Sequence, residues 1–125
     1  MQSLLSRLSE MLARKSRAQR ALLVYLRLSD DDHGESLECG ELFRLEDEVM
    51  VALEGAGAGE FDGNEIGGGY FTLYMYGSSA AQMWDAVAPV LVRSSAPVGS
   101  YVIQRFGGPG AEENRIQIGT PARQI

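Results

Sequence analysis

Apolar side chains recur at every second position in several stretches of the chain, which is the pattern of strands with one buried side. In 20–29, Leu and Val occupy alternate positions, and 70–76 is rich in aromatic residues and ends before Gly77. A short segment that begins at Glu60 leads into a turn of three glycines. The pattern therefore predicts five strands, at 20–29, in the short segment from Glu60, and at 70–76, 99–106 and 114–119.

Three other stretches show the helical spacing of three and four residues between apolar positions. They predict helices at 3–18, 41–54 and 79–93. Pro89 lies inside the last helix and is expected to kink it or to interrupt its hydrogen bonds, because proline has no backbone N–H. The expected buried sets are Leu4, Leu5, Leu8, Met11 and Leu12 in the first helix, Leu42, Leu45, Val49 and Leu53 in the second, and Ala80, Met83, Trp84, Val87 and Leu91 in the third.

The predicted elements follow one another as helix, β, α, β, β, α, β, β. The middle six form the βαββαβ pattern of the ferredoxin-like superfold, an α+β architecture with an antiparallel sheet and two helices on one face. The expected organisation is an N-terminal amphipathic helix in 1–19, one ferredoxin-like domain in 20–119 with an extra C-terminal strand, and a loose tail in 120–125.

Composition and charge narrow the class of protein. A chain of 125 residues is one domain, and its net charge of -6 argues against a duplex-DNA binder, which needs a basic surface. Cys39 is the single cysteine, so no internal disulfide forms and the cytoplasm is the expected compartment. The longest apolar run, Ala21–Leu26, is far too short to span a membrane, so no membrane partner is expected.

The charge is unevenly distributed along the chain. Residues 1–28 carry a net charge of +5 and the remainder carries -11. Between Asp30 and Glu65, Arg44 is the single base among many acids. Such asymmetry can steer a basic protein partner, or a second copy of the chain, toward the acidic region.

The alternation in the predicted strands gathers all five tyrosines on one side of the sheet. The apolar sets of the first and third strands should meet the helices, and burying Gln104 costs less than burying Arg105, which sets the phase of 99–106. The opposite side then carries aromatic and basic residues, types that are enriched at binding hot spots. The predicted interface residues are Tyr25, Arg27, Tyr70, Tyr74, Tyr76, Tyr101 and Arg105, with Arg115 on the same side.

An aromatic sheet side of this kind should be covered, and three coverings are open. It docks against the same side of a second chain in a homodimer, or the N-terminal helix lies across it, or it binds another partner such as single-stranded RNA. The sequence around Gly69–Tyr76 fits the central motif of RNA-binding βαββαβ domains poorly, and the acidic total charge disfavours RNA as well.

The most notable polar cluster is Asp62, Asn64 and Glu65, which lies beside a glycine-rich turn. Paired carboxylates and an amide can hold a divalent cation or share acid–base work. The spacing does not match a calcium-binding EF-hand loop, and turn chemistry explains the same residues without a ligand. Two further hypotheses are weaker, a metal at the acids around His33 and a nucleophilic pair of His33 with Cys39.

One stretch resembles a known group of proteins. The segment Glu60–Gly77 (EFDGNEIGGGYFTLYMYG), with Gly99–Val102 and Arg105–Gly110 further along, is similar to a group of small uncharacterised bacterial proteins. The likeness covers roughly 41–119 and implies a bacterial source but no activity. A weaker likeness, at the level of fold, is to small acidic ferredoxin-like regulators that inhibit an enzyme by direct binding.

The sequence shows no catalytic constellation, so the favoured function is a non-enzymatic binding or regulatory module that acts through protein–protein contacts. No cofactor is expected. The alternative is a small-ligand or metal-binding protein, or an enzyme, with its site at Asp62, Asn64 and Glu65.

Overall fold

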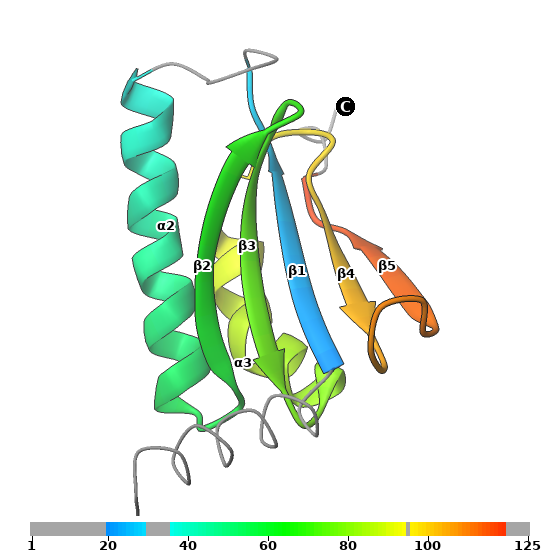
Figure 1. The fold of residues 1–125 in the computed structure, drawn as a ribbon. Coiled ribbons are helices and arrows are strands. Elements are labelled where there is room, and N and C mark those ends of the chain that lie inside the picture. Colours follow the sequence, from blue (N-terminus) through cyan, green and yellow to red (C-terminus); the bar gives the residue numbers. More distant parts are fainter. Residues whose placement is uncertain (1–19, 30–35, 95, 120–125) are drawn as a thin grey trace, which may run out of the picture.

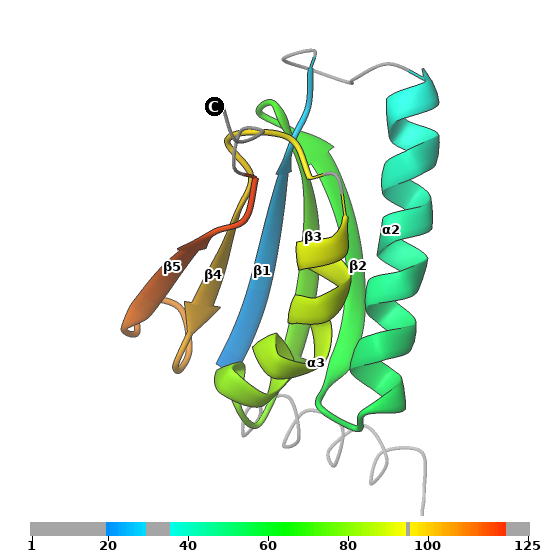
Figure 2. The ribbon, with the colours of Figure 1, turned by 180° about the vertical axis from the view of Figure 1, so that it is seen from behind.

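A computed structural model describes residues 20–29, 36–94 and 96–119. They form an α+β structure in which five antiparallel strands make one sheet and two helices cover one side of it (Figures 1 and 2). The elements are β1 (Arg20–Arg27), α2 (Ser36–Gly55), β2 (Glu60–Gly67), β3 (Tyr70–Gly77), α3 (Ala80–Arg93), β4 (Tyr101–Arg105) and β5 (Glu113–Gln117). The predicted N-terminal helix, the acidic stretch around His33 and the predicted tail lie outside the described residues.

The strands lie in the order β2-β3-β1-β4-β5, so β1 is the central strand. Each neighbouring pair is antiparallel, and Tyr25 stands beside Thr72 of β3 on one side and Tyr101 of β4 on the other. The pairing of β5 outside β4 makes this sheet larger than the plain four-stranded ferredoxin-like arrangement. The α+β class predicted from the sequence is thereby confirmed.

The core lies between the sheet and the two helices. The predicted inward residues of β1 and β3, which include Leu22, Val24, Phe71 and Met75, are fully buried. From α2 the core receives Leu42, Leu45, Val49 and Leu53, and from α3 it receives Ala80, Met83, Val87, Val90 and Leu91. In β1, β3, α2 and α3, the period-two and helical patterns therefore identified the buried residues, apart from Val90, which is also buried, and Trp84, which is only partly buried.

Two helix ends differ from the prediction. Helix α2 begins at Ser36 rather than at 41 and continues through Gly40, whose Cα faces open space. Helix α3 begins after Ser79, whose side chain accepts a hydrogen bond of 3.1 Å from the backbone N–H of Gln82. The helix continues past Pro89 to Arg93, so the proline does not end it.

The β2–β3 hairpin contains an irregularity that positions the candidate site. Its two-residue loop is Gly68-Gly69, in which both residues have positive φ, as a tight hairpin turn requires. Along β2, the register shifts between Phe61 and Asn64, so that Asp62 and Gly63 together lie opposite Tyr74. This is a β-bulge, and Gly63 has a φ of 105° that other residues rarely adopt.

Candidate functional site: an aromatic sheet face

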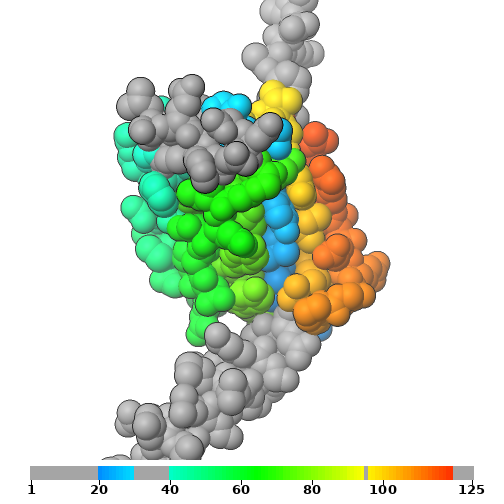
Figure 3. All heavy atoms as spheres, turned by 45° about the horizontal axis from the view of Figure 1, so that its top comes forward, coloured from blue at the N-terminus to red at the C-terminus, as the bar shows by residue number. Residues whose placement is uncertain are grey.

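The side of the sheet that faces away from α2 and α3, here called the open face, carries the five tyrosines that the alternation predicts. The strand registers place the following residues on it: Glu60, Glu65 and Gly67 from β2, Tyr70, Thr72, Tyr74 and Tyr76 from β3, Ala21, Leu23, Tyr25 and Arg27 from β1, Tyr101, Ile103 and Arg105 from β4, and Glu113, Arg115 and Gln117 from β5. Figure 3 shows the strands as coloured bands that lie side by side on this face.

Three of the tyrosines form one aromatic cluster near the middle of the open face. The rings of Tyr25 and Tyr101 are stacked, with centroids 4.7 Å apart and planes 16° from parallel. Tyr70 meets both rings edge-on, with centroids 5.9 Å from Tyr25 and 5.6 Å from Tyr101. Both arrangements are favourable for aromatic quadrupoles. All three side chains are half-buried, so each ring holds its neighbours in place and keeps part of its surface available.

Two arginines flank this cluster. The guanidinium carbon of Arg115 lies 3.8 Å from the centroid of the Tyr101 ring, and that of Arg27 lies 5.2 Å from the Tyr70 ring. Both distances are within the range of cation–π attraction. The main chain of Arg27 is also fixed, because its N–H donates to the buried Ser100 Oγ at 2.9 Å. The cluster formed by Tyr25, Tyr70, Tyr101, Arg27 and Arg115 is called the tyrosine cluster below.

Small and apolar side chains also lie on the open face, between its larger residues. Ala21 is fully buried, Thr72 is 6% exposed and Leu23 is 9% exposed, although neither described helix lies over this side. The surface that is left is therefore made mainly of phenol rings and guanidinium groups, which suits contact with another macromolecule better than the enclosure of a small molecule.

Tyr74 and Glu65 form a hydrogen-bonded pair at the β2 side of the open face. The Tyr74 hydroxyl donates to a Glu65 carboxylate oxygen at 2.6 Å. This hydrogen bond, with burial as the second cause, raises the pKa of Tyr74 from 10.0 to about 12. The pKa of Tyr25 is also raised, mainly by burial and then by the nearby Tyr101. Both phenols are thus neutral at neutral pH, and the charge of the open face comes from its Arg and Glu residues.

The Tyr74 pKa gives a direct pH prediction. Ionisation of Tyr74 should have its midpoint near pH 12, seen as the difference in phenolate absorbance between the wild-type protein and Tyr74→Phe. In Glu65→Gln the midpoint should fall toward 10, because the carboxylate charge is gone. Since the folded-state pKa is the higher one, the stabilisation is present below pH 10 and is lost as the pH rises from 10 to 12. A wild-type midpoint at 10 would contradict the assigned hydrogen bond.

The polar cluster predicted from the sequence is not assembled as one site. The Asn64 side-chain amide donates to a Glu46 carboxylate oxygen on α2 at 2.6 Å, which places it on the helix side. Glu65 follows it in the strand and binds Tyr74 on the open face. Asp62 lies in the bulge of β2, opposite Tyr74 of β3. Among the described residues, no group of three His, Cys, Asp or Glu side chains is placed to hold a metal ion.

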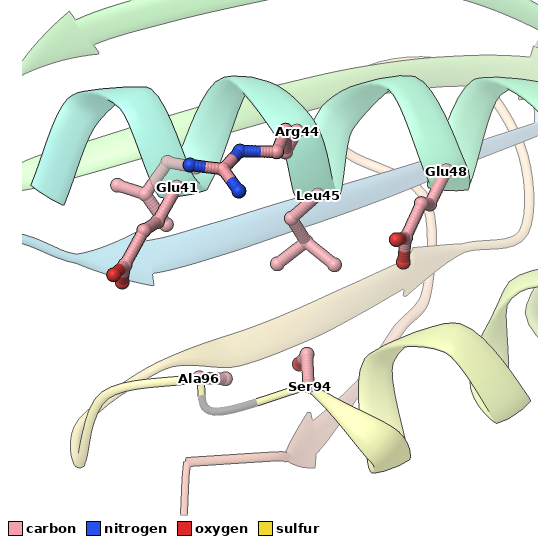
Figure 4. Close-up of a pocket in the computed structure, with 7 residues that line it drawn as sticks. Glu41, Arg44, Leu45, Glu48, Ser94 and Ala96 are labelled. Atoms are coloured by element: carbon pink, nitrogen blue, oxygen red, sulfur yellow. The ribbon is translucent and has the colours of Figure 1, made fainter. Parts of the chain in front are cut away.

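Two hollows on the helix side are lined by residues that the structure describes. One, of about 380 Å³, lies between α2 and the segment after α3. Figure 4 shows Glu41, Leu45 and Glu48 projecting from α2 toward Ser94 and Ala96 there. The second, of about 510 Å³, lies between the two helices and is lined by Asp47, Glu48, Val51, Ala52, Val90 and Arg93. Both are open, with charged rims, and neither gathers acid–base or nucleophilic groups around one point.

Comparison with known proteins adds no functional information. A scan against models of protein families, a search of curated proteins and a search of solved structures each found no match. None of the described helices is long and apolar enough to span a membrane. The open face is therefore assessed from its own chemistry.

Sequence reasoning placed the tyrosines and arginines of the open face but did not place Glu65 among them. A strict period of two puts Glu60 and Glu65 on opposite sides of β2, because they are an odd number of residues apart. The bulge at Asp62 and Gly63 adds one residue and returns Glu65 to the side of Glu60. The Asp-Gly pair within a strand-like stretch is the signal that points to such a bulge.

Proposed function

We propose that this chain is a non-enzymatic protein-binding module whose contact surface is the open face. The observation that carries the proposal is the tyrosine cluster, in which half-buried rings pack together beside two guanidinium groups. Tyr and Arg dominate the hot spots of protein interfaces. Rings that already support one another lose little conformational freedom when a partner binds, so such a surface is preorganised for contact.

We assign the fold, at a finer level than α+β, to the ferredoxin-like class. The order β1-α2-β2-β3-α3-β4 and the strand order β4-β1-β3-β2 support this assignment, with β5 as an addition at the edge. The likeness of Glu60–Gly77 to small bacterial proteins, together with the single Cys39, supports a bacterial cytoplasmic protein. Fold class does not decide function, which rests on the open face.

A second surface is a candidate for contact with a basic partner. Helix α2 carries Glu41, Asp47, Glu48 and Glu54 as exposed acids, with Arg44 as the exposed base among them. Glu46 is only partly exposed and accepts the hydrogen bond from Asn64. The acids along this helix would attract a basic protein over a distance of about 10 Å at ordinary ionic strength.

Affinity capture tests the proposed function. The bait is the immobilised full chain, and the sample is a lysate of the cells from which the protein comes. Proteins retained by the wild-type chain should be lost from Tyr25→Ala/Tyr101→Ala, because this double change removes the stacked pair. The control bait Tyr25→Phe/Tyr101→Phe keeps both rings and should retain them. An identical set on all three baits would reject the open face as the contact surface.

The acidic surface of α2 is tested with a fourth bait. Asp47→Lys/Glu48→Lys reverses two exposed charges and leaves the Glu46–Asn64 hydrogen bond intact. A basic partner that docks on α2 should be lost from this bait and kept by Glu54→Gln. If every captured protein stays bound to the reversed bait, α2 is not a docking surface.

A further inference from the structure

We infer that residues 1–19 dock on the helix side of their own molecule, in a groove between α2 and α3. The inference rests on the acidic surface of α2 that was proposed as a contact for a basic partner, and it names the occupant of that surface. The proposed role of the open face does not depend on it. The groove, the apolar and charged residues of the segment and the position of β1 carry the inference together.

The groove is made of the two hollows on the helix side. Glu48 lines both of them, so they adjoin along the side of α2 that faces α3. Val51 is 68% exposed, although it lines a hollow between two helices. From Glu41 to Ala52 the groove follows α2 for about 17 Å, at a rise of about 1.5 Å per residue. Its apolar lining consists of Leu42, Leu45, Val51, Ala52, Val90 and Ala96.

The residues before β1 carry an apolar stripe that fits this groove in length. The stripe of the helix predicted at 3–18 begins at Leu4 and ends at Leu12. It would be about 12 Å long, which is within the length of the groove. An amphipathic helix that lays its apolar face into an apolar groove is a recurring mode of recognition.

Charge complementarity assigns this segment to α2. Residues 1–19 contain four basic residues and one acid, whereas α2 contains six acids and one base. The last turn of α2 contains Glu54 and no basic residue, while the last turn of α3 contains Arg93. Cations stabilise the C-terminal end of a helix, because that end carries the negative pole of the helix dipole. The stretch Arg14–Arg17, which holds three bases, can supply the cations that α2 lacks.

The start of β1 lies at the end of the structure where this contact is possible. The Arg20 guanidinium group donates to the Ser78 carbonyl oxygen at 3.2 Å, just before α3. Figure 1 shows the C-terminal end of α2 at the same end of the molecule. Residues 13–19 can span up to about 23 Å when extended. A helix with its side chains is about 10–12 Å across, so this connection can pass the helix layer and leave the apolar stripe in the groove.

The open face suits the segment less well than the groove does. The formal charges of the open face cancel, so a basic segment gains no net attraction there. Its surface is mainly phenol rings and guanidinium groups, whereas the groove offers aliphatic side chains and an acidic rim. The charged residues of the open face are Arg27, Arg105, Arg115, Glu60, Glu65 and Glu113.

Paramagnetic broadening of amide signals tests the inference on the full chain. In a Cys39→Ser background, one sample carries a nitroxide at Val92→Cys, because Val92 is 73% exposed on α3 and lines neither hollow. A second sample carries it at Gln117→Cys, an exposed position on the open face. The amides of residues 4–12 should lose most of their signal intensity with the nitroxide on α3 and keep it with the nitroxide on β5.

A charge variant tests the contact with the end of α2. Arg14→Glu/Arg17→Glu brings two further acids to Glu54 and should weaken docking on the order of tenfold, so that the signals of residues 4–12 recover. Arg14→Lys/Arg17→Lys keeps both charges and should leave the broadening unchanged. Adding Glu54→Arg to the acidic variant should restore part of the broadening. Unchanged amide signals from the sheet show that each variant is folded.

Several results would overturn the inference. Broadening of residues 4–12 from Gln117→Cys alone would place the segment on the open face, and broadening from neither position would show that it does not dock. Broadening seen only between a spin-labelled chain and a separate isotope-labelled chain would assign the groove to the segment of a second copy.

The capture baits separate this inference from the proposed function. A basic protein that is lost from Asp47→Lys/Glu48→Lys, with the signals of residues 4–12 not broadened, would give α2 to another protein and reject the segment. The bait Tyr25→Ala/Tyr101→Ala tests the open face by itself. A failure of the segment to dock therefore leaves the proposed function to its own experiment.

Discussion

Replacing Tyr101 with alanine is expected to weaken the binding of a protein partner to the open face on the order of 30-fold. Its ring stacks on Tyr25, meets Tyr70 edge-on and lies under the guanidinium group of Arg115. Truncation of a central hot-spot residue costs about 2 kcal/mol or more. About 2 kcal/mol corresponds to roughly a 30-fold change in a dissociation constant. Isothermal titration calorimetry with a protein that the wild-type bait retains measures the change.

The matched variant is Tyr101→Phe, which keeps the ring and removes only the hydroxyl. Its dissociation constant should stay within about threefold of the wild-type value, because stacking and burial carry the contact. Hydrogen–deuterium exchange of the β4 amides checks that the alanine variant is still paired in the sheet. A folded Tyr101→Ala chain that binds the partner as tightly as the wild-type protein would exclude the tyrosine cluster from the contact surface.

Replacing Gly77 with alanine is expected to destabilise the protein by about 2–3 kcal/mol, as overpacking at a close backbone approach does. A Cβ atom at Gly77 would lie 2.6 Å from the carbonyl oxygen of Ala58 and 3.0 Å from Sδ of Met83. Gly59 faces it across the same contact, where a Cβ would lie 2.6 Å from the Tyr76 carbonyl oxygen. Both obstacles include main-chain atoms, which cannot rotate away. Urea-induced unfolding measures the loss.

Gly55→Ala provides the control for this prediction. Gly55 is the last residue of α2, and a Cβ atom there would meet nothing within 4 Å. This change should leave the free energy of unfolding unchanged or raise it by up to about 1 kcal/mol, since alanine loses less backbone entropy on folding than glycine. Equal stability of Gly77→Ala and the wild-type protein would contradict the close packing of the β3 end against the segment before β2.

The fold was largely predictable because apolar residues alternate regularly in the two adjoining strands β1 and β3. In β1 and β3 the inward set is entirely apolar and fully buried or nearly so. The phase of β4 was decided by the cost of burying Arg105 against Gln104, and the buried Gln104 amide oxygen accepts a hydrogen bond of 2.9 Å from Asn114. Gln104 rather than Arg105 is buried because a neutral amide can find a partner inside the sheet, whereas a guanidinium group is costlier to satisfy there.

Other features could not be predicted from local pattern. Helix α2 starts one turn before the expected position, because the cost of an exposed glycine at Gly40, about 1 kcal/mol, is small beside the packing of a 20-residue helix. The phase that buries Gln104 also predicts an inward Phe106, two residues further along, but β4 ends at Arg105 and Phe106 is 40% exposed. Element ends depend on tertiary packing that the spacing of apolar residues does not contain.

In the candidate site as well, some features were predictable from the strand pattern and others were not. Tyr25, Tyr70 and Tyr101 were placed together by alternation, and the structure brings their rings into contact. The grouping of Asp62, Asn64 and Glu65 rested on nearness in sequence, which in a strand sends neighbouring side chains to opposite faces. Asn64 therefore reaches Glu46 and Glu65 reaches Tyr74. The bulge that completes the open face depends on one glycine with positive φ, which no periodic pattern reveals.

The most direct test of the central claim is an isotope-filtered nuclear Overhauser experiment on the labelled chain mixed with an unlabelled protein that the wild-type bait retains. It detects only contacts between different molecules. The account predicts intermolecular contacts from the ring protons of Tyr25, Tyr70 and Tyr101, with none from α2 or α3. Intermolecular contacts confined to the helices would contradict the claim that the open face is a surface for binding protein.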